Sequence, residues 1–314
     1  MKIGFLFPGQ GTQKIGMGQD FYQTYPEAKK VYQEVEKITG IPIAKISFEG
    51  PDEVLQQTEY TQLTIVTESL AILAVLKSYG IEANASAGLS LGEYTALIED
   101  GILDVATGIQ LVQKRGSIMQ EKTPEGNWKM AAVLGLEASK VEAICQEVSQ
   151  HDFVQVANYN TIGQTVMAGS EQGIQEATAL AKEQGAKKVS LLQTAGPFHT
   201  IQLQACAEDF QKVCQNIPLH QKPSKVVKNL NGTFYQPNDN LAEILAKHMM
   251  SPVQFTKVLE TMYQNGIDTY IEIGPGRTLS GFVKHMKFEG NIQIWNIQRV
   301  SDLEQVIKEV KKNA

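Results

Sequence analysis

Cysteine, arginine and long apolar runs are scarce in this chain. Its 314 residues include three cysteines, which cannot all pair with one another and which lie in helical patterns, so we expect reduced thiols and a cytoplasmic location. No apolar run approaches the length that spans a bilayer, and no apolar signal segment precedes the first strand pattern, so we expect no membrane partner. The net charge of −6 argues against a nucleic-acid partner.

The sequence also lacks internal repeats and low-complexity segments, and what is present has the composition of a soluble globular protein. Hydrophobic residues make up 42% of the chain and charged residues 20%, which are ordinary values. A chain of this length can bury a large core, and we expect one large domain together with a smaller one.

Residues 88–93 have the pattern G-x-S-x-G. They follow a short apolar run at 83–87 and open a helical spacing at 94–98, and the order strand, sharp turn, helix is typical of a nucleophile elbow. Ser90 is then the nucleophile at the carboxyl end of the strand, and the backbone N–H of Leu91 is the natural first donor to an oxyanion. The same pattern also arises by chance in loops rich in glycine and serine.

Apolar periodicity predicts strands and helices along the rest of the chain. Strands are expected at residues 3–7, 129–136, 153–158, 164–169, 188–193, 225–229, 269–273 and 293–297. Helices are expected at residues 26–39, 60–79, 104–122, 138–148, 171–184, from 199 to about 217, and from 303 onward. Between 129 and 193 the order β-α-β-β-α-β is the ferredoxin-like split motif. We therefore predict an α/β protein with a large domain at 1–126 and 197–314 and an inserted small domain at 127–196.

A glycine-rich loop at residues 8–13 follows the first strand. It lacks the Gly-Lys-Ser/Thr ending of a phosphate loop and the third glycine of a dinucleotide-binding fingerprint. Such a loop can instead bring backbone N–H groups close to a substrate oxygen. A plain tight turn explains the pattern equally well.

His199 lies where a predicted strand passes into a helix, and from such a position an imidazole can reach the carboxyl edge of a sheet. The positive end of the helix disfavours imidazolium, so we expect a neutral ring that serves as the base for Ser90. The other histidines follow or lie within helical patterns and are less well placed: His151, His220, His248 and His285.

A histidine base needs a group that holds its second ring nitrogen. Asp209 is the nearest acid after His199 but is not clearly placed for this role, and the alternatives are the side chain of Gln254 or a nearby backbone carbonyl. Arg115 is one of three arginines in the chain and lies in the predicted helix 104–122. Its planar fork suits a carboxylate ligand, although a solvated helix arginine is the alternative reading.

Four sequence blocks are spread from one end of the chain to the other. They are Phe-Pro-Gly-Gln-Gly-Thr-Gln at 7–13, Gly-Leu-Ser-Leu-Gly-Glu-Tyr at 88–94, Gly-Pro-Phe-His at 196–199 and Glu-Ile-Gly-Pro-Gly at 272–276, with shorter matches at 115–116, 157–160 and 252–254. In order and spacing the chain resembles the bacterial malonyl-CoA:acyl carrier protein transacylases over essentially its whole length. The resemblance implies an α/β-hydrolase-like large domain with an inserted ferredoxin-like small domain.

The resemblance also implies roles for the reacting groups. Ser90 would carry the acyl group, and His199 would act as its general acid and base. Gln254 would help to orient His199. The backbone N–H groups of Gln10 and Leu91 would form the oxyanion hole.

A second set of positions would contact the substrate. Arg115 would bind the malonyl carboxylate, and Asn160 would lie near the mouth of the site. Phe198 would crowd an α-methyl group. The family often has histidine before the nucleophile, whereas this chain has Leu89, and we expect this difference to alter the polarity of the pocket rather than the reaction.

The implied function is that of an acyltransferase that moves a malonyl group from malonyl-CoA to the phosphopantetheine thiol of acyl carrier protein, for fatty acid synthesis. The implied mechanism is ping-pong through a malonyl-serine intermediate and needs no metal or organic cofactor. We expect the protein to be a monomer. One alternative is a stand-alone acyltransferase for polyketide synthesis, with the same chemistry and another carrier protein. The other is a serine thioesterase or hydrolase, which would release the acyl group to water and would leave Arg115 without a task.

Overall fold

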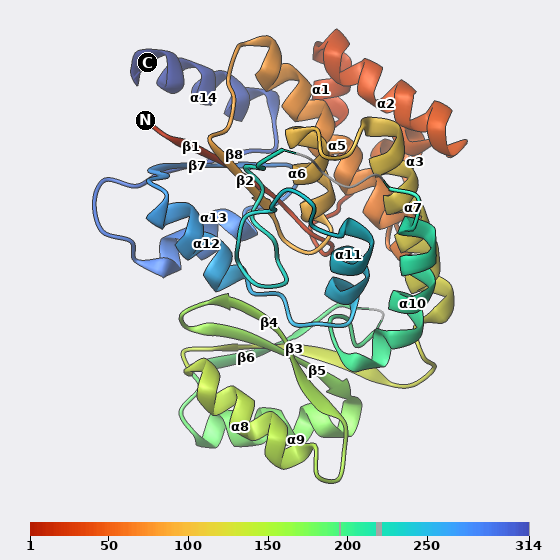
Figure 1. Ribbon diagram of the computed structural model, residues 1–314, viewed down its shortest axis with the longest axis vertical. Helices are drawn as coiled ribbons and strands as arrows, with labels where there is room; N and C mark the ends of the chain where they lie inside the picture. Colours follow the sequence, from red (N-terminus) through yellow and green to blue (C-terminus); the bar gives the residue numbers. More distant parts are fainter. Residues whose placement is uncertain (195, 218–221, 314) are drawn as a thin grey trace.

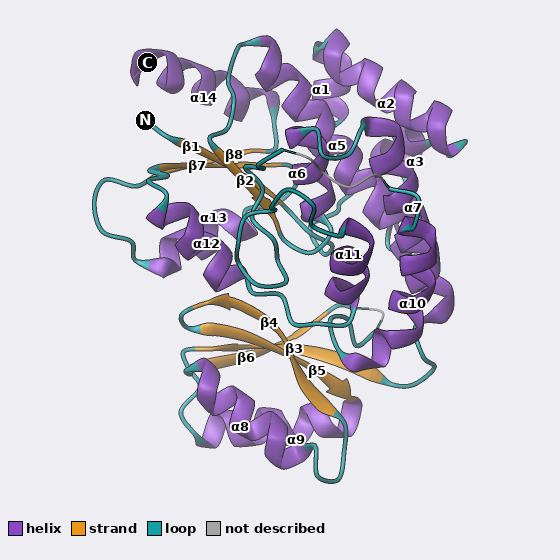
Figure 2. Cartoon of the chain, in the orientation of Figure 1, coloured by secondary structure: helices purple, strands orange, loops and turns teal. Residues whose placement is uncertain are grey.

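Two β-sheets organise the chain, and they lie in different parts of the molecule (Figure 2). The computed structural model describes residues 1–194, 196–217 and 222–313. The first sheet is parallel throughout, with the strand order β2-β1-β7-β8. Its strands are β1 (Ile3–Phe7), β2 (Ala85–Gly88), β7 (Thr269–Ile273) and β8 (Gln293–Ile297).

Helices cover both faces of this parallel sheet, which explains why its strands are almost continuously apolar. Phe5 and Phe7 pack into one hydrophobic cluster, whereas Leu6 between them packs into a second cluster on the opposite face. Figure 1 shows α12 and α13 on one side of the strands and α5 and α14 on the other. The helices of this part of the chain are α1 (Gln19–Thr24), α2 (Pro26–Thr39), α3 (Ile43–Glu49), α4 (Asp52–Leu55), α5 (Thr58–Ser78), α6 (Gly92–Asp100), α7 (Val105–Lys122), the short 3-10 helix η1 (Ile201–Leu203), α10 (Gln204–Cys214), α11 (Leu241–Met249), α12 (Phe255–Gln264), α13 (Thr278–Met286) and α14 (Val300–Asn313).

The second sheet is antiparallel and confirms the predicted ferredoxin-like motif. Its strand order is β4-β5-β3-β6, and α8 and α9 cover the face that points away from the rest of the chain (Figure 1). The elements are β3 (Trp128–Leu134), α8 (Ala138–Val148), β4 (Val154–Thr161), β5 (Gln164–Ser170), α9 (Glu171–Glu183) and β6 (Lys188–Leu192). The bounds of 127–196 for an inserted domain stay a prediction.

A short backbone pairing ties the second sheet to the first part of the molecule. The N–H of Tyr159 in β4 donates to the carbonyl of Val253 at 2.8 Å, and the N–H of Val253 donates to the carbonyl of Ala157 at 2.9 Å. The Ala-Asn-Tyr-Asn and Pro-Val-Gln segments, which lie far apart in the sequence, are therefore neighbours. Asn158 and Asn160 of β4 line the same cavity as Leu89 and Ser90, which follow β2 of the parallel sheet.

Helix α5 is a core helix. It is the one helix of the described ranges that is long and apolar enough to cross a membrane, but 83% of its most apolar window is buried inside the protein. It packs against α2, α3 and α7, and this packing accounts for its apolar residues all around the axis.

Most predicted elements are confirmed within a few residues, and two differ. The strand expected at 225–229 is reduced to single bridges, which join Val226 to Ser86 and Val227 to Phe234. The helix expected from 199 begins only at Gln204, after η1, because the backbone of His199 is in the left-handed region with φ of 60°. The helices α1, α3, α4 and α12 were not predicted.

Glu68 on α5 supplies a test of core electrostatics. Burial raises its pKa to about 8, with smaller opposing effects of Lys14 and Asp20, and its Oε2 has no hydrogen-bond partner among the described residues. The folded state therefore holds a proton that the unfolded chain releases above the ordinary carboxyl pKa of 4.5. The free energy of unfolding should fall by about 1.4 kcal/mol per pH unit as the pH rises from 4.5 to about 8.

The glutamine of the E68Q variant is neutral at every pH, so this variant should not lose stability in this way. The melting temperature of E68Q minus that of the unmodified protein should therefore increase between about pH 5.5 and pH 8. Thermal unfolding followed by circular dichroism measures the difference. The E82Q variant, at an exposed carboxylate, is the control and should show no such gain. Parallel curves for E68Q and the unmodified protein over this range would contradict the interpretation.

Candidate active site

The turn between β2 and α6 is a nucleophile elbow with Ser90 at its tip. Ser90 has φ of 53°, in the left-handed region that L-residues rarely adopt. Two glycines allow the close packing on which this turn depends. A Cβ on Gly88 would lie 1.9 Å from the carbonyl carbon of Gly92, and a Cβ on Gly92 would lie 2.1 Å from the carbonyl oxygen of Phe7.

Asn229 fixes the elbow from the side. Its Oδ1 accepts the backbone N–H of Ser90 at 2.8 Å, and its Nδ2 donates to the carbonyl of Gly88 at 2.7 Å. Asn229 is fully buried. Sequence reasoning missed it, although one signal was present: it follows the segment of Val226 and Val227, which pairs beside β2, so it lies at the carboxyl edge of the sheet.

Ser90 and His199 are in direct contact. Oγ of Ser90 lies 2.7 Å from Nε2 of His199, and Nδ1 of His199 lies 2.9 Å from the backbone carbonyl oxygen of His248. A carbonyl only accepts hydrogen bonds, so Nδ1 carries the proton and Nε2 is free to accept the proton of the serine. The arrangement is that of a serine nucleophile with its base.

The group at Nδ1 corrects the sequence-based alternatives. Asp209 pairs with Lys122 and Lys212 instead. Within the described ranges the side chain of Gln254 has no hydrogen bond to His199; its backbone N–H donates to the carbonyl of Asn229 at 2.8 Å. Of the alternatives, the backbone carbonyl is the one that is present.

Burial keeps the imidazole of His199 neutral. Its pKa lies well below the ordinary value, first because the ring is buried and then because the neighbouring side chains of His248 and Arg115 oppose its protonation. The sequence predicts a neutral ring, but it attributes the neutral state to a helix N-terminus at His199. Helix α10 begins five residues after His199, beyond η1, so no helix N-terminus lies at this residue. A buried neutral imidazole is able to take a proton over the ordinary pH range.

Arg115 is a buried cation next to the nucleophile. Its side chain donates from Nη2 to Oγ of Ser90 at 3.0 Å and from Nη1 to Oε1 of Gln62 at 2.9 Å. It lies 5.5 Å from the ring of Tyr94, and its Nε has no partner among the described residues. No carboxylate of those residues pairs with it. A guanidinium that is only 2% exposed and lacks a counter-ion within the described ranges is suited to bind the carboxylate of a ligand.

These groups border one cavity of about 580 Å³. The backbone N–H groups of Gln10 and Leu91 have no acceptor among the described residues. Nδ2 of Asn160 donates to Gln164 at 2.9 Å, whereas its Oδ1 has no partner there. Of the predicted site residues, those that line the cavity are Gln10, Ser90, Arg115, Asn160, Phe198 and His199.

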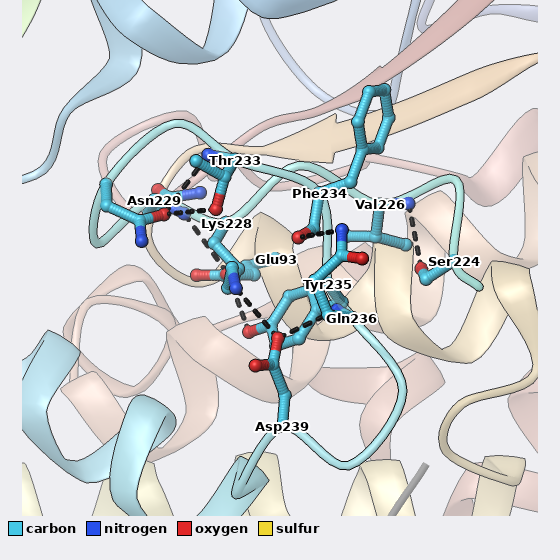
Figure 3. Close-up of polar contacts among 11 residues, drawn as sticks. Glu93, Ser224, Val226, Lys228, Asn229, Thr233, Phe234, Tyr235, Gln236 and Asp239 are labelled. Carbon is cyan, nitrogen blue, oxygen red and sulfur yellow. Dashed lines mark hydrogen bonds and ion pairs between the residues drawn. The ribbon is translucent and has the colours of Figure 1, made fainter. Parts of the chain in front are cut away.

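Glu93 connects the elbow to the surrounding loops, and the sequence analysis gave it no role. Its Oε1 accepts from the hydroxyl of Tyr235 at 2.9 Å and from the N–H of Asn229 at 3.2 Å. Figure 3 shows Glu93 beneath the loop that carries both residues, with the Lys228–Asp239 ion pair beside it. On its other side, Oε2 lies 2.9 Å from Nδ1 of His248.

The remaining histidines lie elsewhere. His151 pairs with Glu176, and His285 bonds to a carbonyl of its own helix. His220 lies outside the described residues. Across the described ranges, no group of three His, Cys, Asp or Glu side chains is arranged to hold a metal.

Comparison with known proteins agrees with this geometry. The "Acyl transferase domain" family matches residues 4–291. The malonyl CoA-acyl carrier protein transacylase of Bacillus subtilis (strain 168) is 36% identical over 315 residues, covering 100% of this chain and 99% of the relative. The crystal structure of the corresponding transacylase from Clostridium perfringens has a TM-score of 0.93 and 37% identity, over 99% of this chain and 98% of that one.

A third comparison includes a carrier protein. The complex of a type II PKS acyl-carrier protein with its malonyl-transacylase has a TM-score of 0.92 and 29% identity, over 98% of this chain and 100% of that one. From the match to the family, the identity over the full length and the shared fold, this chain belongs to the acyl transferase domain family, among the malonyl CoA-acyl carrier protein transacylases.

Proposed function

We propose that this protein transfers a malonyl group from malonyl-CoA to the phosphopantetheine thiol of acyl carrier protein, and so supplies fatty acid synthesis. The observation that carries the proposal is the buried guanidinium of Arg115, which has no carboxylate partner within the described ranges and lies 3.0 Å from Oγ of Ser90. A malonyl thioester has the carboxylate that this cation lacks. The names of the full-length relatives support the same substrate pair.

In the first half-reaction Oγ of Ser90 attacks the thioester carbonyl and passes its proton to Nε2 of His199. The negative charge on the carbonyl oxygen is accepted by the backbone N–H groups of Gln10 and Leu91, which have no other acceptor in the part of the chain described. The C–S bond then breaks, CoA leaves as the thiol with the proton of His199, and the malonyl group stays on Ser90 as an ester.

In the second half-reaction the thiol of the carrier protein attacks that ester. His199 takes the thiol proton, the C–O bond to Ser90 breaks, and the serine oxygen regains the proton from His199. The same base therefore serves both steps, and the 2.9 Å contact of its Nδ1 with the His248 carbonyl holds the ring in the required tautomer throughout.

Three further positions shape the cavity. Phe198, which lines the cavity directly before His199, would crowd an α-methyl group on the substrate. Leu89 supplies an apolar wall where the family often has histidine. Asn160 offers its unpartnered Oδ1 to an N–H of the thioester substrate.

Other features of the protein follow as proposals. The domains run from 1 to 126 and 197 to 314 for the large one and from 127 to 196 for the small one, and the separate hydrophobic cluster of the second sheet supports this division. The three cysteines are buried and unpaired, which supports a cytoplasmic location. We propose a monomer, since one chain supplies all the groups around Ser90.

The polyketide alternative has one observation in its favour, the likeness to a malonyl-transacylase in complex with a type II PKS acyl-carrier protein. The chemistry is shared, so the two carriers are separated by measuring transfer to each. A hydrolase is disfavoured, because water as acceptor gives the buried Arg115 no function and because the family is one of acyl transferases.

The proposed reaction is tested by intact mass spectrometry. With malonyl-CoA alone, the protein should gain one malonyl group at Ser90, and the adduct should persist in buffer and move to acyl carrier protein that bears phosphopantetheine. The S90A variant should gain none, and the H199A variant should be acylated about 10²-fold or more slowly. Release of CoA and free malonate without an adduct would mean a hydrolase instead.

Replacement of Arg115 tests whether this side chain binds the carboxylate of the substrate. An acetyl thioester leaves the guanidinium unpaired, which costs on the order of 2–5 kcal/mol. The R115A variant should therefore lose about 10²-fold in kcat/KM for malonyl-CoA while its activity with acetyl-CoA changes little. Acylation rates with the two thioesters give the ratio.

The R299A variant, at an exposed arginine, is the matched control and should keep the ratio of the unmodified protein. A preference for malonyl-CoA that survives in R115A would show that another group binds the carboxylate.

A further inference from the structure

Gln62 on α5 holds one end of the guanidinium of Arg115, and no step above assigns it a task. Its Oε1 accepts a hydrogen bond from Nη1 at 2.9 Å, while Nη2 donates to Oγ of Ser90 at 3.0 Å. Gln62 is fully buried, and it is not among the described residues that line the cavity. It therefore acts on a substrate through Arg115 rather than by contact.

The contacts of the amide fix which of its ends faces the cation. A guanidinium only donates hydrogen bonds, so the atom opposite Nη1 is the oxygen. Nε2 of the same amide lies 3.5 Å from Oε1 of Gln10 and 3.4 Å from Sδ of Met119, which are both acceptors. The guanidinium is thus oriented by a polar group that has no net charge.

The absence of charge on Gln62 matters because a carboxylate would fit the same space. Glutamate has nearly the size and shape of glutamine, and at this position it would form an ion pair with the guanidinium. The guanidinium would then be neutralised before any substrate binds. A substrate carboxylate would have to bind beside the first one, and like charges repel strongly in a buried site. An amide leaves the positive charge available to the substrate.

The other groups around the guanidinium also leave its charge uncompensated. The hydroxyl of Ser90 is neutral, and burial raises the pKa of Tyr94 far above its usual range, so that side chain is neutral as well. Burial lowers the pKa of Arg115, and Tyr94 and Glu93 oppose this effect. The carboxylate of Glu93, however, accepts hydrogen bonds from other groups. Gln62 is therefore the buried contact of Arg115 at which a nearly isosteric substitution would introduce a counter-ion.

We propose that Gln62 is a positioning residue that sets the charge preference of the acyl site: its neutral amide orients the guanidinium of Arg115 without neutralising it, so that the site selects an acyl group ending in a carboxylate. This inference rests on the function proposed above and deepens it. Arg115 supplies the charge, and Gln62 keeps that charge unpaired until the substrate binds.

Two substitutions of Gln62 separate the charge of the side chain from its hydrogen bond. Q62E keeps the shape and the acceptor but adds a negative charge. It should lose about 10²-fold in kcat/KM for malonyl-CoA, as expected for R115A, while its activity with acetyl-CoA stays within about threefold. Q62L removes the acceptor without adding charge, so the ratio of the two activities should fall by less than about tenfold.

The stability of Q62E gives a readout that does not depend on the reaction. The folded protein already buries the guanidinium, so a carboxylate that pairs with it should stabilise the fold. The half-buried Gln10 can turn its amide nitrogen toward the second carboxylate oxygen. Q62E should therefore melt about 2 °C or more above the unmodified protein. Q62L should melt below it, because the guanidinium loses an acceptor.

Acylation rates with the two thioesters and thermal unfolding followed by circular dichroism supply the measurements. Q110E is the control, because it makes the same change at an exposed position of α7, the helix that carries Arg115; it should alter neither the ratio nor the melting temperature. A Q62E variant that keeps the preference for malonyl-CoA, or that melts below the unmodified protein, would overturn the inference. Failure of the unmodified protein to form a malonyl adduct would instead refute the proposed function, and a raised melting temperature in Q62E would then still show that Gln62 keeps Arg115 unpaired.

Discussion

A guanidinium that is buried without a carboxylate is the interaction on which the rest of this site depends. Charges buried in this way are destabilising unless they are paired, and Arg115 is only partly compensated by Gln62, the hydroxyl of Ser90 and the ring of Tyr94. We propose that the substrate supplies the missing carboxylate. This requirement links binding to reaction, because the donor that would hold the carboxylate also contacts the attacking oxygen.

The elbow and its supports hold the nucleophile against this cation. Ser90 stays in the left-handed region because packing on every side over-determines the turn: the two glycines bring it against the end of β1, and Asn229 bonds to it twice. Glu93 then connects Asn229 to His248, and the His248 carbonyl reaches the base. One continuous set of buried polar contacts thus holds the reacting groups, and the position of each group depends on the others.

The sequence predicts the framework well and the polar supports poorly, for physical reasons. Buried strands such as β1 and β7 and long amphipathic helices such as α2 are visible as apolar periodicity, whereas α4, with four residues, is too short to show any. Ser90 follows from a local motif, and His199 follows from its place between a predicted strand and a predicted helix, to which the resemblance adds support. Asn229 is 139 residues from Ser90 in the chain, and the acceptor at His199 is a backbone carbonyl, which no side chain reveals.

The central claim is that Arg115 binds the carboxylate of the acyl group while Ser90 carries it, and a crystal structure of the acylated protein tests it most directly. The account predicts a malonyl ester on Ser90 whose carboxylate accepts two hydrogen bonds from the guanidinium of Arg115, at about 2.7–2.9 Å. A malonyl carboxylate that points to solvent, with Arg115 still bonded only to Gln62 and the serine oxygen, would contradict it.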